Sequence, residues 1–337
     1  MIRWPHSPLV WAPLLVGGLA CALVLSLGIG SVPLAPARVV QALLRPNGQA
    51  VRAADIAIVW DLRLARALLA ACVGAGLAGA GAAFQGLFRN SLADPFVIGA
   101  SGGAALGATV AIVLGGAVAS WGVSVPLAAF AGALLAVALV FGIAQSSGGE
   151  SATALLLAGA ALSTMLGALV SLLMLFNDHQ LQEIFAWLLG SFSGRSWPQL
   201  ALSAPPLLLG LVALWLLARP LDALLSGAQT ARSLGMPLGR TRAAIIAAAS
   251  LTTAAAVAAS GIIGFVGLIA PHIARLLCGA SHARLIPASA LIGALLMLLA
   301  DSAARSMLPP LELPVGIVTA MIGGPFFLWL LARRGHQ

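Results

Sequence analysis

The stretch "ASGIIGFVGLIAPHIARLLCG" at residues 259–279 is almost wholly apolar, yet it contains the pair Pro271-His272 and then Arg275. A proline interrupts helical hydrogen bonding, and a histidine or arginine is costly in hydrocarbon. The glycines before the proline permit a tight turn or a re-entrant passage. We therefore expect Pro271 to lie in the first turn of a short helix, where its missing N–H costs little. We expect a structural role for His272, because no second ligand lies at metal-binding spacing.

The composition predicts an all-α polytopic membrane protein. Of the 337 residues, 61% are hydrophobic and only 8% are charged, whereas roughly a quarter of a soluble domain is charged. The apolar runs are long and continuous, which excludes the alternating pattern of a membrane β-barrel. We expect residues 1–337 to form a single transmembrane domain. The ten expected spans are residues 9–30, 63–86, 96–118, 122–144, 152–175, 200–218, 243–260, 262–279, 284–303 and 314–332.

The basic residues are all arginine, and they lie mostly in the predicted loops. Ten of the seventeen arginines fall on the inner side if the N-terminus is inside, so the positive-inside rule places both termini in the cytoplasm. The net charge of +8 therefore does not argue for nucleic acid. Since the chain has no lysine, it cannot carry the lysine of an ATP-binding P-loop. The three cysteines stand in apolar stretches without a metal-binding pattern, so we expect no metal site.

Two segments resemble each other, "AGAAFQGLFRNSLADP" at 80–95 and "SGIIGFVGLIAP" at 260–271. Each has small residues, an F-x-G-L-[FI] core and then a proline. An odd number of predicted spans separates them, so they would run in opposite directions through the membrane. This pattern is typical of transporters built from inverted repeats, although chance similarity in a sequence rich in glycine and alanine would also explain it.

Three motifs, in order along the chain, resemble those of one family. They are "RNSLADPFVIGASGGAALGA" (89–108), "GIIGFVGLIAPHIARLL" (261–277) and "ADSAAR" with "ELPVGIVTAMIGGPFFLWLL" (300–331). The match extends from about residue 55 to the end. The chain resembles the permease subunit of the bacterial ABC importers for iron chelates, haem and cobalamin.

The resemblance implies the type II ABC importer fold and a set of partners. Such a permease is a homodimer in the inner membrane, surrounded by lipid. Two ATPase subunits bind ATP and magnesium, so this chain itself would have no cofactor and no enzymatic activity. A periplasmic binding protein delivers the cargo. We expect haem as the cargo, with a ferric siderophore or cobalamin as the alternatives.

The cytoplasmic loop 219–242 is short, amphipathic and rich in small residues, which permits close approach of another protein. The resemblance implies that it couples the permease to the ATPase. The implied contacts are Ser226, Gly227, Ala231, Leu234 and Gly235. An ordinary basic inner loop is the alternative.

The resemblance also implies cytoplasmic gates and outer docking groups. Asn90 with Leu92 would form one gate and Ser151 with Thr153 the other, although Asn, Asp and Pro favour turns in any case. The outer arginines Arg63, Arg66 and Arg305 would pair with carboxylates of the binding protein, or else snorkel to the interface. The family's "LRLPR" is "LRLAR" here, with Ala65 in place of proline. Asp301 and Glu312 are expected to be structural and to pair with arginines such as Arg305.

In the homodimer that the resemblance implies, the translocation path is expected along the dimer axis, lined by the fifth and tenth spans and the outer loop after the fifth. Its candidate residues are Met165, Leu166, Leu169, Leu172 and Met174, not all of which can share one helical face. Arg195 and, less strongly, His179 are candidates for contact with an anionic cargo. A secondary transporter would need ionisable groups in mid-membrane, and an intramembrane enzyme would need a catalytic pair or a metal motif. The sequence favours neither.

Overall fold

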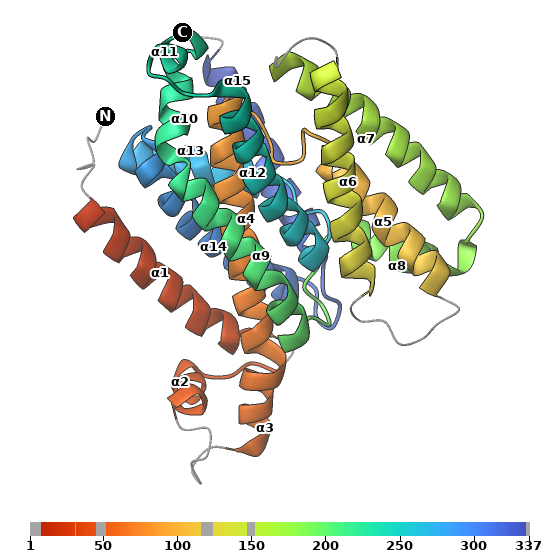
Figure 1. Cartoon of the computed structure of the whole chain (residues 1–337). Coiled ribbons are helices and arrows are strands. Elements are labelled where there is room, and N and C mark those ends of the chain that lie inside the picture. Colours follow the sequence, from red (N-terminus) through yellow and green to blue (C-terminus); the bar gives the residue numbers. More distant parts are fainter. Residues whose placement is uncertain (1–7, 31, 45–51, 116–123, 147–151, 335–337) are drawn as a thin grey trace.

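The structure is a computed structural model that describes residues 8–30, 32–44, 52–115, 124–146 and 152–334. Helices account for nearly all of this part of the chain (Figure 1). The helices are α1 (Pro8–Gly28), α2 (Pro36–Leu44), α3 (Ala53–Ala57), η1 (Ile58–Leu64), α4 (Ala65–Leu87), α5 (Ala100–Gly115), α6 (Ser124–Ser146), α7 (Ala152–Leu175), η2 (Asp178–Gln180), α8 (Leu181–Leu188), α9 (Trp197–Leu216), α10 (Ala218–Leu225), α11 (Ala228–Ser233), α12 (Leu238–Ser260), α13 (Val266–Cys278), α14 (His282–Ser306) and α15 (Val315–Arg334).

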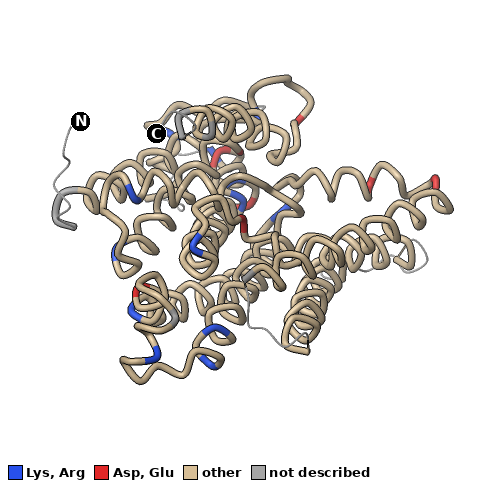
Figure 2. The backbone as a smooth tube through the Cα atoms, turned by 90° about the horizontal axis from the view of Figure 1, so that it is seen from above, with Lys and Arg blue, Asp and Glu red and all other residues tan. Residues whose placement is uncertain are grey.

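The helices confirm the expected membrane-spanning architecture. In the described part of the chain, seven helical segments are long and apolar enough to cross a membrane. Three shorter apolar helices, α5, α13 and α15, complete the ten expected spans. Figure 2 shows how few positions along the tube carry a charge. The remaining helices are short connections at the two ends of the bundle.

Helix α4 lies in the middle of the bundle, packed against α9, α12, α13 and α14 (Figure 1). Its contacts with two of these neighbours are backbone to backbone. A Cβ atom at Gly74 would overlap the carbonyl of Gly293 on α14, and a Cβ atom at Gly81 would overlap the carbonyl of Gly267 on α13. Small residues permit such close approach, which is the main source of helix association in lipid, where hydrophobic burial contributes little. The sequence of α4 therefore fixes where α13 and α14 lie.

Helix α13 corrects the expectation for Pro271. The helix begins at Val266, after Phe265 in the left-handed region with φ 69°, so the proline lies beyond the first turn. A proline at this position leaves the carbonyl four residues earlier, that of Gly267, without its helical donor. Gln85 Nε2 of α4 donates to that oxygen at 3.2 Å, and Gln85 Oε1 accepts a hydrogen bond from Arg275. The Gly267 carbonyl that Pro271 leaves free in α13 therefore forms a hydrogen bond between α13 and α4.

The two similar segments lie against each other. Gly267 of the second packs on Gly81 and Pro95 of the first and accepts a hydrogen bond from Gln85. Residues 84–87 end α4, and the following Arg89 contacts α10. Residues 261–265 precede α13, where Gly261 packs against the carbonyl of Trp187. The first F-x-G-L motif is therefore the end of a helix and the second is the start of one. The two motifs therefore do not share a local structure.

The close contact between α4 and α14 predicts that one added methyl group at this contact lowers the stability of the protein substantially. We expect Gly74→Ala to lower the stability of the protein by about 1–3 kcal/mol, because the backbones must separate. Gly142→Ala is the matched control, because nothing lies within 4 Å of a Cβ atom at Gly142 on α6. Thermal unfolding of the detergent-purified protein measures both. Equal stability of the two variants would contradict this account of the packing.

Candidate functional site

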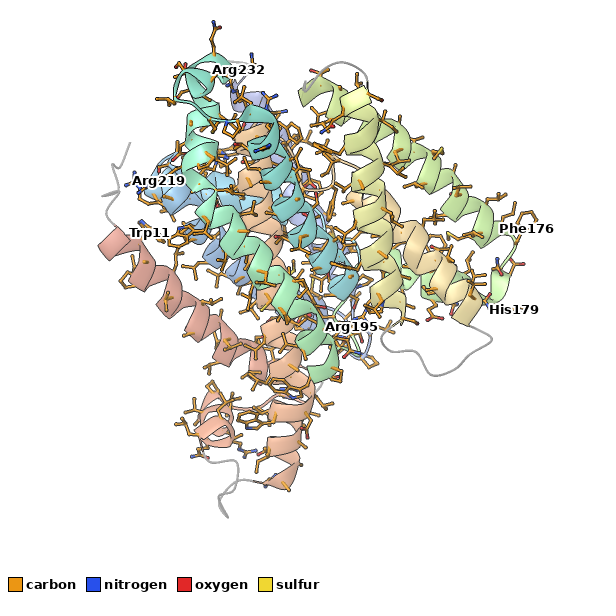
Figure 3. The ribbon with its side chains drawn as sticks, in the orientation of Figure 1. Trp11, Phe176, His179, Arg195, Arg219 and Arg232 are labelled. Carbon is orange, nitrogen blue, oxygen red and sulfur yellow. The ribbon has the colours of Figure 1, made fainter. Side chains whose placement is uncertain are left out.

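Two short helices, α10 and α11, lie at one end of the bundle. We name this the inner end, because the arginine count predicts it to be cytoplasmic, and the opposite end the outer end. In α10, Leu221 and Leu224 are buried against the bundle, so the helix rests on it by one face. Gly227 and Gly235 have positive φ angles of 124° and 78°, which allow the sharp turns on either side of α11. Figure 3 shows Arg219 and Arg232 at this end of the molecule and His179 and Arg195 toward the other end.

The residues expected to contact an ATPase differ in their exposure. Ser226, Leu234 and Gly235 are exposed, and Leu234 leaves 72% of its surface open although it is apolar. Gly227 is half-buried. Ala231 is completely buried, so the expectation that it contacts a partner is wrong in this conformation. Its small side chain instead lets α11 fold back onto the protein.

The turn after α4 contains two of the expected gate residues. Asn90 Oδ1 accepts the backbone N–H of Leu92 at 2.9 Å, and Asp94 Oδ1 accepts that of Phe96 at 2.9 Å. These are side-chain turns of the kind that Asn and Asp favour. Burial raises the pKa of Asp94 to about 6, although the backbone hydrogen bond from Phe96 opposes this shift. Asn90 is exposed and Leu92 is half-buried.

The second expected gate lies at the start of α7. Thr153 is exposed there, and Ser151 lies outside the described residues. The chain segments that follow the two expected gates contact each other. Gly159 of α7 lies against the carbonyl of Val97. The structure thus brings α7 onto the residues that follow the 88–95 turn.

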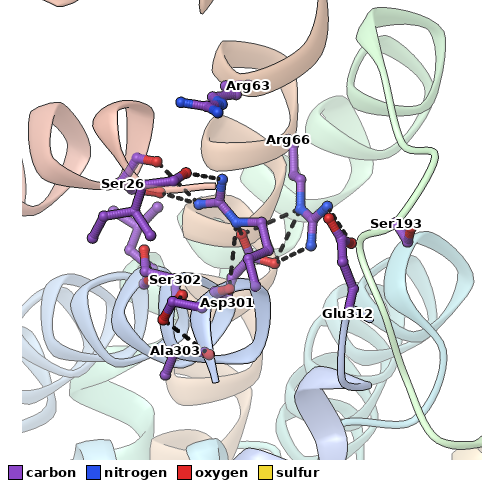
Figure 4. A network of polar contacts seen from close by, with 12 residues as sticks. Ser26, Arg63, Arg66, Ser193, Asp301, Ser302, Ala303 and Glu312 are labelled. Carbon is purple, nitrogen blue, oxygen red and sulfur yellow. Dashed lines mark hydrogen bonds and ion pairs between the residues drawn. The ribbon is translucent and has the colours of Figure 1, made fainter. Parts of the chain in front are cut away.

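Two of the three outer arginines, Arg66 and Arg305, form a buried network with an acid (Figure 4). Asp301 is completely buried and pairs with Arg66 at 2.8 Å and with Arg305 at 3.1 Å. Arg66 also contacts Glu312 at 2.8 Å. Burial alone would raise the pKa of Glu312, but the hydrogen bond and charge of Arg66 lower it overall. The expected structural role of Asp301 and Glu312 as partners of arginines is confirmed.

Arg63 and Arg305 bond to main-chain oxygens near the end of α1. Arg63 donates to the carbonyls of Leu27 and Val32 at 2.7 and 2.6 Å, and Arg305 donates to the carbonyl of Ile29 at 2.8 Å. All three guanidinium groups are at least nine-tenths buried. The expectation that they stand free to dock a binding protein is therefore wrong in this structure. They hold α1, α4 and α14 together instead.

A cavity of about 330 Å³ lies at the outer end, between α5, α6, α8 and the end of α12. Its polar lining includes Glu183, Ser191, Ser193 and Arg195. Trp187 also lines it and is 8% exposed. The indole Nε1 of Trp187 and the Nε of Arg195 are both buried, and neither reaches an acceptor among the described residues. Burial lowers the pKa of Arg195. Two residues that line the cavity thus each carry an N–H group without an acceptor among the described residues.

Helix α7 separates the expected path residues by face. Met165, Leu169 and Leu172 share an exposed face, with 55%, 41% and 49% of their surfaces open. Leu166 is buried and Met174 is partly buried against the core, so neither belongs to that face. His179 is exposed on η2 and is not among the residues that line the cavity. The ring of His272 lies edge-on against Phe326, with 5.7 Å between the ring centroids.

The expectations from sequence missed two residues, Asp222 and Trp187. Asp222 is the only acid in the 219–242 loop, which was a usable signal. It accepts hydrogen bonds from Ser281 and His282, about 60 positions further on, and no local pattern reveals that pairing. Trp187 stands in the segment 176–198, which contains several aromatic residues and no pattern that singles this one out.

Comparisons with known proteins cover nearly the whole chain. The sequence model described as the FecCD transport family matches residues 18–333. The cobalamin import system permease protein of Halobacterium salinarum is 44% identical over 82% of this chain and 74% of its own length. The hemin transport system permease protein of Yersinia pestis is 39% identical over 83% and 84% of the two chains. The Fe(3+)-citrate import system permease protein of Bacillus subtilis is 39% identical over 93% and 92%.

A solved structure has the same fold. It is an inward-facing conformation of a metal-chelate type ABC transporter, with a TM-score of 0.84 and 36% identity. The match covers 95% of this chain and 97% of that chain. The agreement therefore extends over the bundle and both of its ends.

The buried network predicts unequal costs for its two acids. We expect Asp301→Asn to lower stability by about 3–5 kcal/mol, because it leaves two buried guanidinium groups without their shared counter-charge. Glu312→Gln should cost less than about 1 kcal/mol, because that side chain is 38% exposed. Thermal unfolding in detergent compares the two variants. A loss at Glu312→Gln as large as that at Asp301→Asn would contradict the assignment.

Proposed function

The chain belongs to the FecCD transport family of ABC importer permeases for iron chelates, haem or cobalamin, and we propose that its own cargo is haem or another iron chelate that carries carboxylate groups. The observation that carries this proposal is the outer cavity. Trp187 and Arg195 line it, and each has a buried N–H group that no described residue accepts. A carboxylate oxygen of the cargo supplies both the acceptor and the negative charge that such donors favour.

The assembly that we propose has two copies of the chain around a shared path. The exposed apolar faces of α7 and α15 support this arrangement. The exposed face of α7 consists of Met165, Leu169 and Leu172, and that of α15 includes Met321 and Ile322. Apolar walls bind a large chelate weakly, so the cargo can leave again. The turn with Asn90 and Leu92 and the start of α7 with Thr153 would close the path on the inner side.

The energy for transport comes, in this proposal, from partner subunits. An ATPase subunit with ATP and magnesium would dock on α10 and α11 of each copy, and a binding protein would deliver cargo at the outer end. The exposed apolar Leu234 beside Gly235 supports the docking surface, because a partner that covers this side chain removes apolar area from water. Both termini would then lie in the cytoplasm, on the side of α10 and α11.

The docking surface predicts an uncoupled variant at Gly235. Nothing lies within 4 Å of a Cβ atom there, so a large side chain would project toward the partner. We expect Gly235→Leu to abolish most ATP-driven uptake. Gly235→Ala is the matched control, because it carries the same strain from the positive φ angle but little bulk. Uptake by reconstituted vesicles measures both. Unimpaired uptake by the leucine variant would rule out this surface.

The cargo is tested by uptake into vesicles that hold this chain with its ATPase, in the presence of the binding protein. Haem, ferric citrate and cobalamin are compared. We expect uptake of haem or ferric citrate, and we expect Arg195→Gln to reduce it about tenfold by removing a charged donor to a carboxylate. Trp187→Phe should reduce it less, since it removes a neutral donor and keeps the ring. Uptake that is unaffected by both substitutions would exclude the cavity as a cargo site.

Cobalamin is the second candidate. The observation in its favour is the 44% identity with the cobalamin permease, against 39% with the hemin permease. The same vesicle assay decides between them. Uptake of cobalamin alone would favour this candidate and would overturn the proposal that the cargo is haem or an iron chelate with carboxylate groups.

A further inference from the structure

Helix α10 holds the first turn of α14 through one carboxylate. Asp222 Oδ1 accepts the backbone N–H of His282 at 2.9 Å and lies 2.6 Å from the Nδ1 atom of its ring. Asp222 Oδ2 accepts the hydroxyl of Ser281 at 3.1 Å. His282 is the first residue of α14, and Ser281 makes no cap of its own to that helix. The N-terminus of α14 is therefore capped from another helix, where a negative charge is favourable.

The histidine in this contact reaches α4 as well. His282 is 1% exposed, and a Cβ atom at Gly86 would overlap its Nε2 atom. Gly86 is the second-last residue of α4. The ring therefore fills the space between α4, α10 and α14. A displacement of Asp222 therefore either breaks its hydrogen bonds to His282 or moves the ring and the first turn of α14 with it.

A second contact joins α10 to the turn that follows α4. Arg89 Nε donates to the carbonyl of Leu224 at 2.9 Å, and its Nη2 donates to the same oxygen. Leu224 lies in the last turn of α10, where carbonyls lack helical donors and a cation is favourable. Arg89 has a positive φ of 50°, which an arginine rarely adopts. Arg89 thus has an unfavourable backbone conformation in the turn, and in the same structure its guanidinium group contacts α10.

We propose that Asp222 and Arg89 are positioning residues that transmit movement of α10 to α14 and to the 88–95 turn. The two contacts lie within one turn of α10, so a single displacement of that helix acts on both. One leads to the turn with Asn90 and Leu92, and the other leads along α14 to Asp301 at the outer end. This inference rests on the proposed docking of an ATPase on α10 and α11.

The test compares Asp222→Ala with Asp222→Asn in the full complex in vesicles. The alanine variant loses every acceptor, whereas asparagine keeps the shape and one acceptor for the His282 N–H. We measure ATP hydrolysis and cargo uptake together. The expected result is that Asp222→Ala lowers the cargo moved per ATP by roughly tenfold while hydrolysis continues, as for the loss of a charge-assisted hydrogen bond. Asp222→Asn should recover most of that ratio.

A second variant keeps the inference testable if Asp222→Ala does not assemble. Arg89→Gln removes the guanidinium, and the Leu224 carbonyl keeps its hydrogen bond from the Gly227 N–H at 3.2 Å, so no acceptor is orphaned. We expect the same loss of cargo moved per ATP. The matched control is Arg38→Gln, which makes the same change at an exposed residue of α2.

The outcomes separate this inference from the function on which it rests. Unchanged coupling in Asp222→Ala and Arg89→Gln, or an equal fall of hydrolysis and uptake, would overturn the inference alone. Failure of the unaltered chain to couple uptake to ATP would overturn the proposed function instead.

Discussion

At Gly74 and Gly293 the backbones of α4 and α14 lie so close that neither position has room for a Cβ atom. Helices in lipid gain little from hydrophobic burial, so contacts between small residues and their backbones decide which helices associate. A similar contact at Gly81 and Gly267 holds α13 against α4. The rest of the bundle is arranged around this central pair of contacts. The ends of α4 and α14 consequently meet at both faces of the membrane.

Polar groups inside the bundle follow from this arrangement. At the outer end, α4 and α14 bring Arg66 to Asp301, and the buried carboxylate also pairs with Arg305. At the inner end, the same two helices enclose His282 against Asp222 of α10. Each buried charge in these contacts has a counter-charge or a hydrogen-bond partner, as a medium of low dielectric constant requires. The helix pair therefore links the outer face to the segment on which an ATPase is proposed to act.

The sequence predicts most of the fold and less of the sites. Hydropathy alone located ten spans, because each apolar run has to cross the membrane by itself. The exposed loop with Leu234 and Gly235 was also found, since its small and apolar residues are local in sequence. The buried arginines were misplaced because their partners are backbone carbonyls and acids far along the chain. Pro271 was assigned to the first turn because nothing in the sequence shows that Gln85 receives the carbonyl that the proline leaves free.

The central claim is that this chain converts ATP hydrolysis by a partner into import through α10 and α11. The most direct measurement is the ATP hydrolysis rate of the purified complex in vesicles, with and without the cargo-loaded binding protein. The account predicts that the ATPase co-purifies with this chain and that the loaded binding protein raises the hydrolysis rate. A chain that purifies without an ATPase and takes up cargo on an ion gradient alone would contradict it.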